Sequence, residues 1–362
     1  MKTIVITLFI LTYVIMLTLP KYRQYAATAV AVVMVILGVV SPLEAVNAID
    51  WNVIMMLAGT MGTVYLCIES KMPAMVRDML VNKLKSVKLI FVALALFSGF
   101  VSAFIDNVAT VLMVAPIALA IAKKFNVSPV NTVLTVAVSS NLQGAATLVG
   151  DTTSILLAGY AGMDFMDFFV IDGKPGMFWI VQAGAMATIP ILFWIFRNEK
   201  NRIETTEITK VTDFMPTYAL LATVISLVIA SFIPNKPALT NGLICVFFFI
   251  AVLRYEVGRD EPVATGHDAV LAIDFDTLLL LSGLFVIIQA VTNVGLIDDI
   301  SNAFVNIAGD NLFKIYTILV WFSVLVSAFI DNIPYVATML PVVSGISAQL
   351  GLDPTLLYFG LL

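Results

Sequence analysis

The chain has 362 residues, of which 60% are hydrophobic and only 12% charged, and its mean hydropathy is +1.03. A soluble globular domain carries about 25% charged residues, so this composition excludes a soluble protein and indicates that lipid is the solvent. The net charge is −5 and no stripe or tail is rich in Lys or Arg, which argues against nucleic acid as a partner.

Apolar runs that could cross a hydrocarbon core, which takes about 20 helical residues, follow one another along the chain. They fall at about 3–20, 25–40, 51–69, 88–122, 130–163, 177–197, 214–233, 238–254, 272–295, 312–349 and from 352 onward. The first run follows Lys2 but has no small-x-small cleavage site, which favours a retained helix over a signal peptide. We therefore expect an all-α polytopic membrane protein, with residues 1–362 forming one integral membrane domain.

Basic residues in the loops predict the orientation, because Lys and Arg collect on the cytoplasmic side. Lys21 and Arg23 assign the first loop to the cytoplasm, whereas the loop 41–50 has no basic residue and is expected outside. The further basic segments lie at 70–88, 123–124, 197–210 and 254–259, and the acidic ones at 164–172 and 298–310. These charges agree with one topology in which the N-terminus is outside and the run 88–122 enters from the cytoplasm and returns to it. The run could make two full crossings or one re-entrant hairpin, and the polar Asp106-Asn107 at its centre favours the hairpin.

The hexapeptide SAFIDN occurs twice, at 102–107 and at 327–332, each time inside an apolar run. Pro116 and Pro341 are separated by the same interval as the two copies, and AIDWNVIMMLAG at 48–59 resembles AIDFDTLLLLSG at 272–283. We expect one repeat at about 48–197 and a second at about 272–362. Because the second copy enters from outside, the sequence predicts inverted repeats with two re-entrant hairpins and broken helices, an architecture typical of secondary transporters.

Asp106 and Asp331 stand at the centres of these two apolar copies. A carboxylate deep in a bilayer costs about 2.5–3.5 kcal/mol even on the lenient insertion scale, so a functional role is the first hypothesis and a helix cap the structural alternative. Asp50 and Asp274 are expected to be N-caps at the membrane surface. At a hairpin tip, open carbonyls with Asp106 and Asn107 can bind a cation such as Na⁺, open N–H groups can accept an anion, and the aspartate can carry a proton.

The segment SSNLQGAATLVGDTTSILL at 139–157 is too polar and glycine-rich for a continuous apolar helix. Its relevant members are Ser139, Ser140, Asn141, Gln143, Gly144, Thr147, Gly150, Asp151, Thr152 and Thr153. Irregular backbone at membrane depth survives only where it lines a cavity or is covered by protein. We expect an unwound loop that faces the Asp106 tip, and a glycine-bearing helix contact is the alternative.

The two cysteines and the single histidine do not suggest a metal or disulfide site. Cys67 and Cys245 lie in apolar runs and are expected to be small buried hydrophobes. His267 lies in a polar stretch and is expected in a solvated loop.

The motifs SAFIDNVATVLMVAP, SSNLQGAATLVGDTTSILL and SAFIDNIPYVATMLP resemble the ion-transporter superfamily. That group includes arsenite permeases, NhaD-type Na⁺/H⁺ antiporters, the melanosomal P protein, and citrate and dicarboxylate transporters. The resemblance implies a scaffold domain, a transport domain with two re-entrant hairpins and two broken helices, homodimers and an elevator-like movement. By this resemblance, the first hairpin tip corresponds to Asp106 and Asn107 with Thr110. The first unwound loop corresponds to Asn141 to Asp151, and the second hairpin tip to Asp331 and Asn332.

Carboxylate transporters of this group typically have Ser-Asn-Thr at the tips, whereas both tips here read Asp-Asn. The chain therefore resembles the antiporter, P-protein and arsenite-permease branch more closely. The interval between the two SAFIDN copies would place the counterpart of Ser139 at position 364, past Leu362. We accordingly expect the full protein to continue with a second glycine- and asparagine-rich loop and about two more helices.

Together these observations predict a Na⁺- or H⁺-coupled secondary transporter, not an enzyme, which works by alternating access in a prokaryotic plasma membrane. No cofactor beyond the coupling ion is expected, and the partners would be a small ion or anion substrate and the lipid bilayer. The predicted cation- and substrate-binding residues are Asp106, Asn107, Thr110, Ser140, Asn141, Gly144, Thr147, Gly150, Asp151, Asp331 and Asn332, with Na⁺ held by Asp106, Asn107, Asn141, Asp331 and Asn332. A permease for arsenite or another small organic or inorganic anion, a passive channel and an intramembrane protease are the alternatives.

Overall fold

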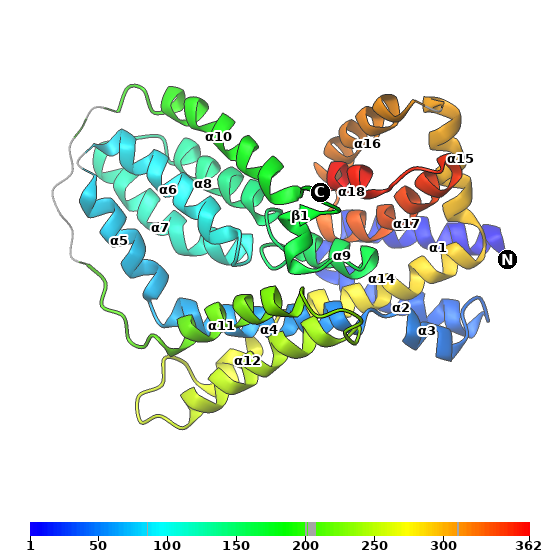
Figure 1. Cartoon of the computed structure of the whole chain (residues 1–362), viewed down its shortest axis with the longest axis horizontal. Helices are drawn as coiled ribbons and strands as arrows, with labels where there is room; N and C mark the ends of the chain where they lie inside the picture. Colours follow the sequence, from blue (N-terminus) through cyan, green and yellow to red (C-terminus); the bar gives the residue numbers. More distant parts are fainter. Residues whose placement is uncertain (85, 200, 202–207, 310) are drawn as a thin grey trace. The chain divides into compact units, whose positions relative to one another are not determined.

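The computed structural model describes residues 1–84, 86–199, 201, 208–309 and 311–362. The loop charges Lys85, Lys200, Arg202 and Asp310, which entered the orientation argument, lie outside the described residues. The described chain is mostly helical, as predicted (Figure 1). Six of the described helices are long and apolar enough to cross a membrane. These are Trp51–Glu69, Asn107–Phe125, Met177–Ile195, Thr240–Val257, Gly266–Asn293 and Asn332–Leu350. If the bent helix pair Leu296–Ala308 and Leu312–Ser327 forms one further span, the number is seven.

A short β-hairpin is the one departure from the all-α expectation within the described residues. Strands β1 (Val170–Ile171) and β2 (Lys174–Pro175) pair antiparallel, with Val170 opposite Pro175. Asp172 and Gly173 between them have φ of 49° and 73°, both in the left-handed region. Asp-Gly with two positive φ angles is typical of the two-residue turn that joins twisted strands, so this local signal was present in the sequence.

Four short helices lie in segments that we expected to be loops, and those expectations were wrong. They are α3 (Pro42–Ala48), α5 (Met72–Lys83), α13 (Gly266–Leu271) and α15 (Leu296–Ala308). Their charged residues lower the local hydropathy, but α15 is amphipathic and needs only one apolar face, and α5 buries its Arg77 and Asp78 as partners of each other. His267 is therefore helical, although its side chain is exposed as expected.

The first compact unit of the chain comprises Met1–Ile54, Gly159–Gly162 and Asp274–Leu362. Its helices are α1 (Lys2–Thr18), α2 (Arg23–Ile36), α3, α14 (Phe275–Asn293), α15, α16 (Leu312–Ser327), α17 (Asn332–Leu350) and α18 (Thr355–Leu361), with the 3₁₀ turn η1 (Pro20–Tyr22) between α1 and α2. Helix α14 packs closely on α2 at Gly283, where a Cβ would lie 2.8 Å from the carbonyl carbon of Ala27. Asp274 is the N-cap of α14, as predicted, and accepts a hydrogen bond from the N–H of Thr277 at 3.0 Å.

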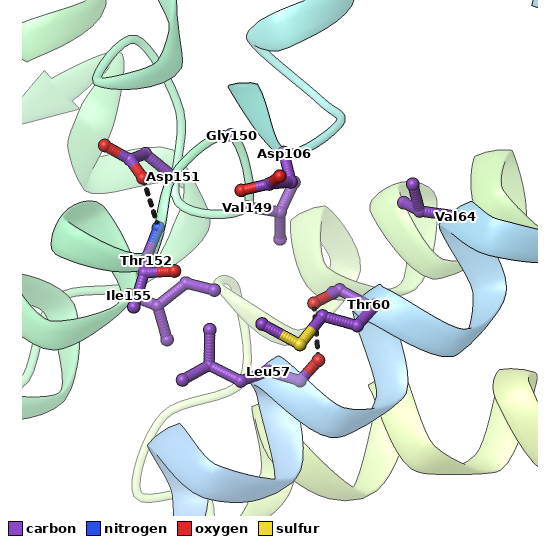
Figure 2. Close-up of a pocket in the computed structure, with 10 residues that line it drawn as sticks. Leu57, Thr60, Val64, Asp106, Val149, Gly150, Asp151, Thr152 and Ile155 are labelled. Carbon is purple, nitrogen blue, oxygen red and sulfur yellow. Dashed lines mark hydrogen bonds between the residues drawn. The ribbon is translucent and has the colours of Figure 1, made fainter. Parts of the chain in front are cut away.

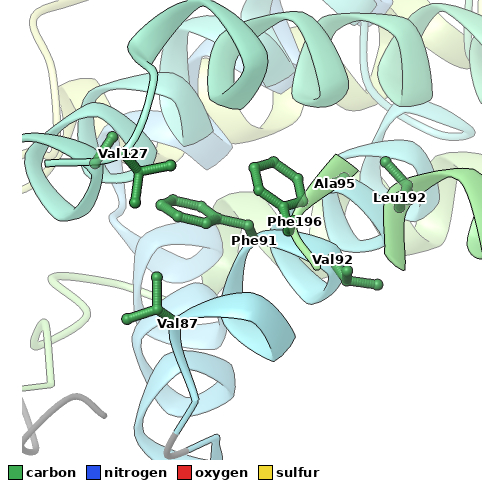
Figure 3. Packing of buried hydrophobic residues seen from close by; sticks show 8 residues of the cluster. Val87, Phe91, Val92, Ala95, Val127, Leu192 and Phe196 are labelled. Atoms are coloured by element: carbon green, nitrogen blue, oxygen red, sulfur yellow. The ribbon is translucent and has the colours of Figure 1, made fainter. Parts of the chain in front are cut away.

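The second compact unit comprises Met55–Ala158 and Met163–Ile273. It holds most of α4 (Trp51–Glu69), then α5, α6 (Val87–Ser102), α7 (Asn107–Phe125), α8 (Pro129–Gly144), α9 (Thr152–Ala161), η2 (Phe165–Phe168), the β-hairpin, α10 (Met177–Ile195), α11 (Met215–Ala230), α12 (Thr240–Val257) and α13. Helix α6 packs against both α7 and α8. Its first turns contribute to a core in which the rings of Phe91 and Phe196 stack with centroids 5.0 Å apart (Figure 3). Cys67 and Cys245 are buried and unbonded to one another, as expected.

Helix boundaries recur along the chain at the interval found in the sequence. Helices α6 and α16 begin and end at positions offset by the interval between the two SAFIDN copies, and so do α7 and α17. Residues 103–106 separate the first pair and 328–331 the second. The bounds of α5 and α15 follow nearly the same offset, so the recurrence also includes helices that hydropathy alone did not reveal.

A buried polar cluster on α5 joins two other parts of the second unit. The Arg77 guanidinium donates to the Met113 carbonyl at 3.1 Å and forms an ion pair with Asp78 at 3.1 Å. Asp78 in turn accepts hydrogen bonds from the N–H and the hydroxyl of Thr209. Burial alone would raise the pKa of Asp78, but the hydrogen bonds from Thr209 and the charge of Arg77 outweigh it and hold this pKa below its usual range.

We expect Asp78→Asn to lower the free energy of unfolding by about 2 kcal/mol, because it weakens charge-assisted hydrogen bonds at a buried site. A carboxyl with a lowered pKa stabilises the fold above its unfolded pKa, and this contribution is lost as the pH falls through the folded pKa. The parent should therefore lose stability relative to Asp78→Asn below about pH 4. Thermal unfolding in detergent, followed by size-exclusion fluorescence, measures both effects. Asp172→Asn, in an exposed turn, is the matched control. If the stability of the parent and of Asp78→Asn depended equally on pH, the lowered pKa of Asp78 would be contradicted.

Candidate functional site

Asp106 starts helix α7 as its N-cap. Its carboxylate accepts a hydrogen bond from the N–H of Ala109 at 3.1 Å, directly after the non-helical residues 103–106. Asp331 does the same for α17 and accepts from the N–H of Ile333 at 3.2 Å. The structural role considered from the sequence, a helix cap, is thus present at both aspartates. Each cap marks the point at which the chain turns between two packed apolar helices.

The interruption predicted between 139 and 157 is present but shorter than expected. Helix α8 continues to Gly144 and α9 begins at Thr152, so Ser140 and Asn141 are helical and only 145–151 leave the helix. The expectation of an unwound segment from Asn141 was wrong at this end. Serine and asparagine lower helix propensity by only a few tenths of a kcal/mol, and contacts with neighbouring helices easily outweigh that.

Three hydrogen bonds connect the Asp106 tip to α8 and to the interruption that follows it. The Asn107 amide donates to the side-chain oxygen of Asn141 at 2.9 Å, and the Ser140 hydroxyl donates to the Asn107 carbonyl at 3.2 Å. The buried Thr147 hydroxyl donates to the carbonyl of Ala103. Side chains predicted from two separate stretches of sequence therefore meet in one place, and the Thr147 contact satisfies a carbonyl that the end of α6 leaves open.

Gly150 lies where two helix ends converge. A Cβ at this position would lie 2.4 Å from the Gly144 carbonyl oxygen, 2.7 Å from that of Ser102 and 2.8 Å from that of Ala103. Those carbonyls belong to the C-terminal ends of α8 and α6, which carry partial negative charge. Only glycine fits this approach, and the oxygens gathered here suit a hard cation better than an anion.

Two buried hydroxyls near the tip have no hydrogen-bond partner among the described residues: Ser102 Oγ and Thr110 Oγ1. Orphaned buried hydroxyls are uncommon and each calls for an explanation such as a bound ion or water. Thr110 was among the predicted residues, but Ser102 was not. The repeat contained the missed signal, because Ser102 is the first letter of the repeated SAFIDN.

A small cavity of about 20 Å³ opens beside the Asp106 tip (Figure 2). Its walls combine the Asp106 carboxylate and Gly150 with apolar side chains and Thr60 of α4. That volume holds one water-sized group. Asp151 also lines it, but its carboxylate accepts hydrogen bonds from the Thr152 N–H at 2.8 Å and the Thr153 hydroxyl at 3.0 Å, so it caps α9.

The second tip has a different partner, which the sequence interpretation missed. Asp331 forms an ion pair with Arg23 of α2, and both side chains are about one-third exposed, at 37% and 30%. Arg23 entered the sequence argument only as an orientation signal. Asn332 accepts a hydrogen bond from Ser327, whereas its counterpart Asn107 reaches Asn141. Asp106 belongs to the second compact unit and Asp331 to the first, so their predicted meeting stays a prediction.

Apolar helices that are interrupted beside a small cavity with a carboxylate in its wall are typical of polytopic membrane transporters. A family model described as citrate transporter matches residues 8–362. The chain therefore belongs to the citrate transporter family, within the ion-transporter superfamily expected from its motifs.

Relatives of known sequence and structure agree with this assignment. An uncharacterised transporter of Mycobacterium bovis, Mb2703, is 28% identical over 363 residues, which cover 98% of this chain and 83% of the relative. The mouse P protein is 23% identical over 334 residues, covering 70% of this chain and 39% of that protein. The crystal structure of the Alcanivorax borkumensis YdaH transporter, described as having an unusual topology, aligns with a TM-score of 0.56 over 91% of this chain and 76% of that one. At 14% identity, this likeness shows the fold alone.

We expect Gly150→Ala to abolish transport and to lower thermal stability, because the new methyl group would collide with three carbonyl oxygens. The matched control is Gly184→Ala in α10, where a Cβ would meet only Leu142 at 3.6 Å, an ordinary contact. Flux in proteoliposomes and melting in detergent measure the two effects. Full activity of Gly150→Ala would contradict the close approach of the two helix ends.

Proposed function

We propose that this protein is a secondary active transporter, coupled to Na⁺ or H⁺, that works by alternating access. The carrying observation is the Asp106 tip, where a carboxylate lies beside a small cavity and next to converging carbonyls of two helix ends. Membership of a transporter family supports the class, and the chemistry of the tip supports the coupling ion.

The donor set at the first tip supports a cation. The Asp106 carboxylate, the carbonyls of Ser102, Ala103 and Gly144, and the orphaned hydroxyls of Ser102 and Thr110 are all oxygen groups. Na⁺ prefers such hard ligands, and a proton could occupy the carboxylate instead. Asn107 and Asn141 hold the tip against α8 and would orient it. Ser140, Thr147 and Gly150 would support the geometry through their backbone contacts.

We also propose that the chain is one membrane domain built from two inverted repeats, at about 48–197 and 272–362, with both tips re-entrant and the N-terminus outside. The recurrence of helix boundaries at one constant offset supports the repeat. The loop charges support the opposite entry of the two hairpins. Assembly as a homodimer, an elevator-like movement and a prokaryotic plasma membrane complete the proposal, on the strength of the family resemblance.

We expect Asp106→Asn and Asp331→Asn each to reduce ion-coupled flux at least 100-fold, because each removes a carboxylate that the proposed cation sites use. At the second tip the cation would compete with Arg23 for this carboxylate. Asparagine is as good an N-cap as aspartate, so these substitutions leave the caps of α7 and α17 in place. Flux is measured in proteoliposomes under Na⁺ and pH gradients, with melting in detergent as the check on folding.

The chain offers matched controls in Asp50 and Asp274, which are also N-terminal caps. Asp50→Asn and Asp274→Asn should keep flux within about two-fold of the parent, because capping is their only assigned role. Unchanged flux in both tip variants would refute cation binding at the tips. An equal loss in all four variants would point to a general effect of charge removal.

A permease for a small anion is the second candidate, favoured by the description of the matching family as citrate transporter. The N-terminal ends of α7 and α17 carry partial positive charge, and at the second tip an anion could compete with Asp331 for Arg23. Uptake assays with radiolabelled citrate and with arsenite, with and without Na⁺ and pH gradients, separate the two candidates. Ion exchange that needs no such substrate favours the antiporter, and flux that requires one favours the permease.

A further inference from the structure

Several basic residues of the second compact unit directly follow buried residues of the core shown in Figure 3. Three fully buried residues of this core, Val87, Ala122 and Phe196, come from α6, α7 and the end of α10. Each is followed directly in the chain by a basic residue, and Lys124 follows one of these. We call the four cations Lys88, Lys123, Lys124 and Arg197 the basic rim. Because the buried residues pack together, the cations of the basic rim gather at one end of the three helices.

The basic rim is surrounded by aromatic and apolar surface. The Lys88 ammonium lies 4.9 Å from the ring centre of Phe193, and the Arg197 guanidinium lies 4.6 Å from that of Trp194. Trp194 itself is 64% exposed, and Ile191 one turn earlier is 56% exposed. Exposed tryptophan beside long basic side chains is typical of the boundary between lipid tails and head groups.

The cations of the basic rim are not neutralised by protein within the described part of the chain. None of the four forms an ion pair there, although Arg77, Lys236 and Arg259 of the same unit all do. Glu199, the carboxylate nearest to Arg197 in the chain, is not paired with it. Among the described residues, the basic rim therefore presents positive charge that no ion pair compensates, at the edge of an apolar surface.

The position of Lys88 is not explained by its own helix. It lies in the first turn of α6, at the positive end of the helix dipole, where a cation is unfavourable and an anion is favourable. No acidic residue lies in that first turn, and Ser86 makes no capping hydrogen bond. The N–H of Val87, the first residue of α6, donates to the Asn201 carbonyl at 3.0 Å, so an external anion at this place would compensate Lys88 itself. Lys123 and Lys124, by contrast, lie in the last turn of α7, where cations are favourable.

From these observations we infer that the basic rim binds the phosphate head groups of anionic phospholipids in the adjacent leaflet. The phosphodiester would contact Lys88 and its neighbours, while the acyl chains lie along the exposed apolar surface beside Trp194. Attraction between a basic residue and an anionic leaflet changes relative affinity about five-fold per charge. This inference concerns a lipid site and does not depend on the proposed coupling ion.

Trp194 provides the probe for a direct test. In the full chain, Trp51→Phe, Trp179→Phe and Trp321→Phe leave Trp194 as the single tryptophan. Its fluorescence is then measured in vesicles of phosphatidylcholine that contain increasing fractions of dibrominated phosphatidylglycerol. A second series uses dibrominated phosphatidylcholine with unbrominated phosphatidylglycerol. We expect stronger quenching by the brominated anionic lipid than random mixing predicts, with a preference of at least five-fold that weakens in 0.5 M salt.

Neutralising the lysines of the basic rim tests the assignment without altering the contact between Arg197 and Trp194. Lys88→Gln/Lys123→Gln/Lys124→Gln should reduce the preference at least five-fold. The matched control Lys21→Gln/Lys174→Gln/Lys314→Gln removes three exposed lysines elsewhere and should leave it unchanged. If the triple variant does not fold, as judged by gel filtration and circular dichroism, Lys88→Gln alone should still lower the preference several-fold.

Three outcomes would overturn the inference. A preference near one in the parent would mean that the lysines act only as orientation signals. An equal loss in the control variant would mean that total charge, and not the basic rim, sets the preference. Reversal of the quenching by millimolar inorganic phosphate would mean that the site takes a soluble anion and not a lipid.

Discussion

Backbone polar groups at helix ends are the constraint on which this structure depends. In a hydrocarbon environment no water satisfies an open N–H or carbonyl, so every interruption of a helix needs partners from the protein. The second unit meets this need with its own side chains: Asp106 caps α7, and the Thr147 hydroxyl donates to the Ala103 carbonyl at the end of α6. The polar residues that a hydropathy profile would count as defects are therefore what permits the interruptions.

The same constraint creates the candidate site. Where α6 and α8 end side by side at Gly150, their last carbonyls point to a common place and give it negative potential. A carboxylate at the tip and two orphaned hydroxyls add further oxygens. In the proposed cation site, stability and function would be linked, because an arrangement that leaves oxygens only partly satisfied is also one that a small cation can complete.

The two tips share a sequence but differ in their surroundings. At the first tip, the Asn107 amide donates a hydrogen bond to Asn141. At the second tip, Asn332 accepts a hydrogen bond from Ser327, and Asp331 forms an ion pair with Arg23. An aspartate paired with arginine and an aspartate beside a small cavity have different electrostatic environments, since the guanidinium neutralises the charge that a coupling ion would otherwise meet. Identical motifs therefore need not have identical roles, and transport measurements on each tip separately are informative.

The sequence by itself determined the class, the interval between the two SAFIDN copies and the position of the helix break at Asp106, because each rests on local chemistry. Composition indicated the lipid solvent, the two copies of SAFIDN revealed the interval that recurs in the helix boundaries, and Asp-Asn inside an apolar run indicated a break. Only the tertiary structure decided that α8 continues through Asn141, that Ser102 lacks a partner and that Arg23 meets Asp331. Those features depend on contacts between residues far apart in the chain, and such contacts leave no periodic pattern in the sequence.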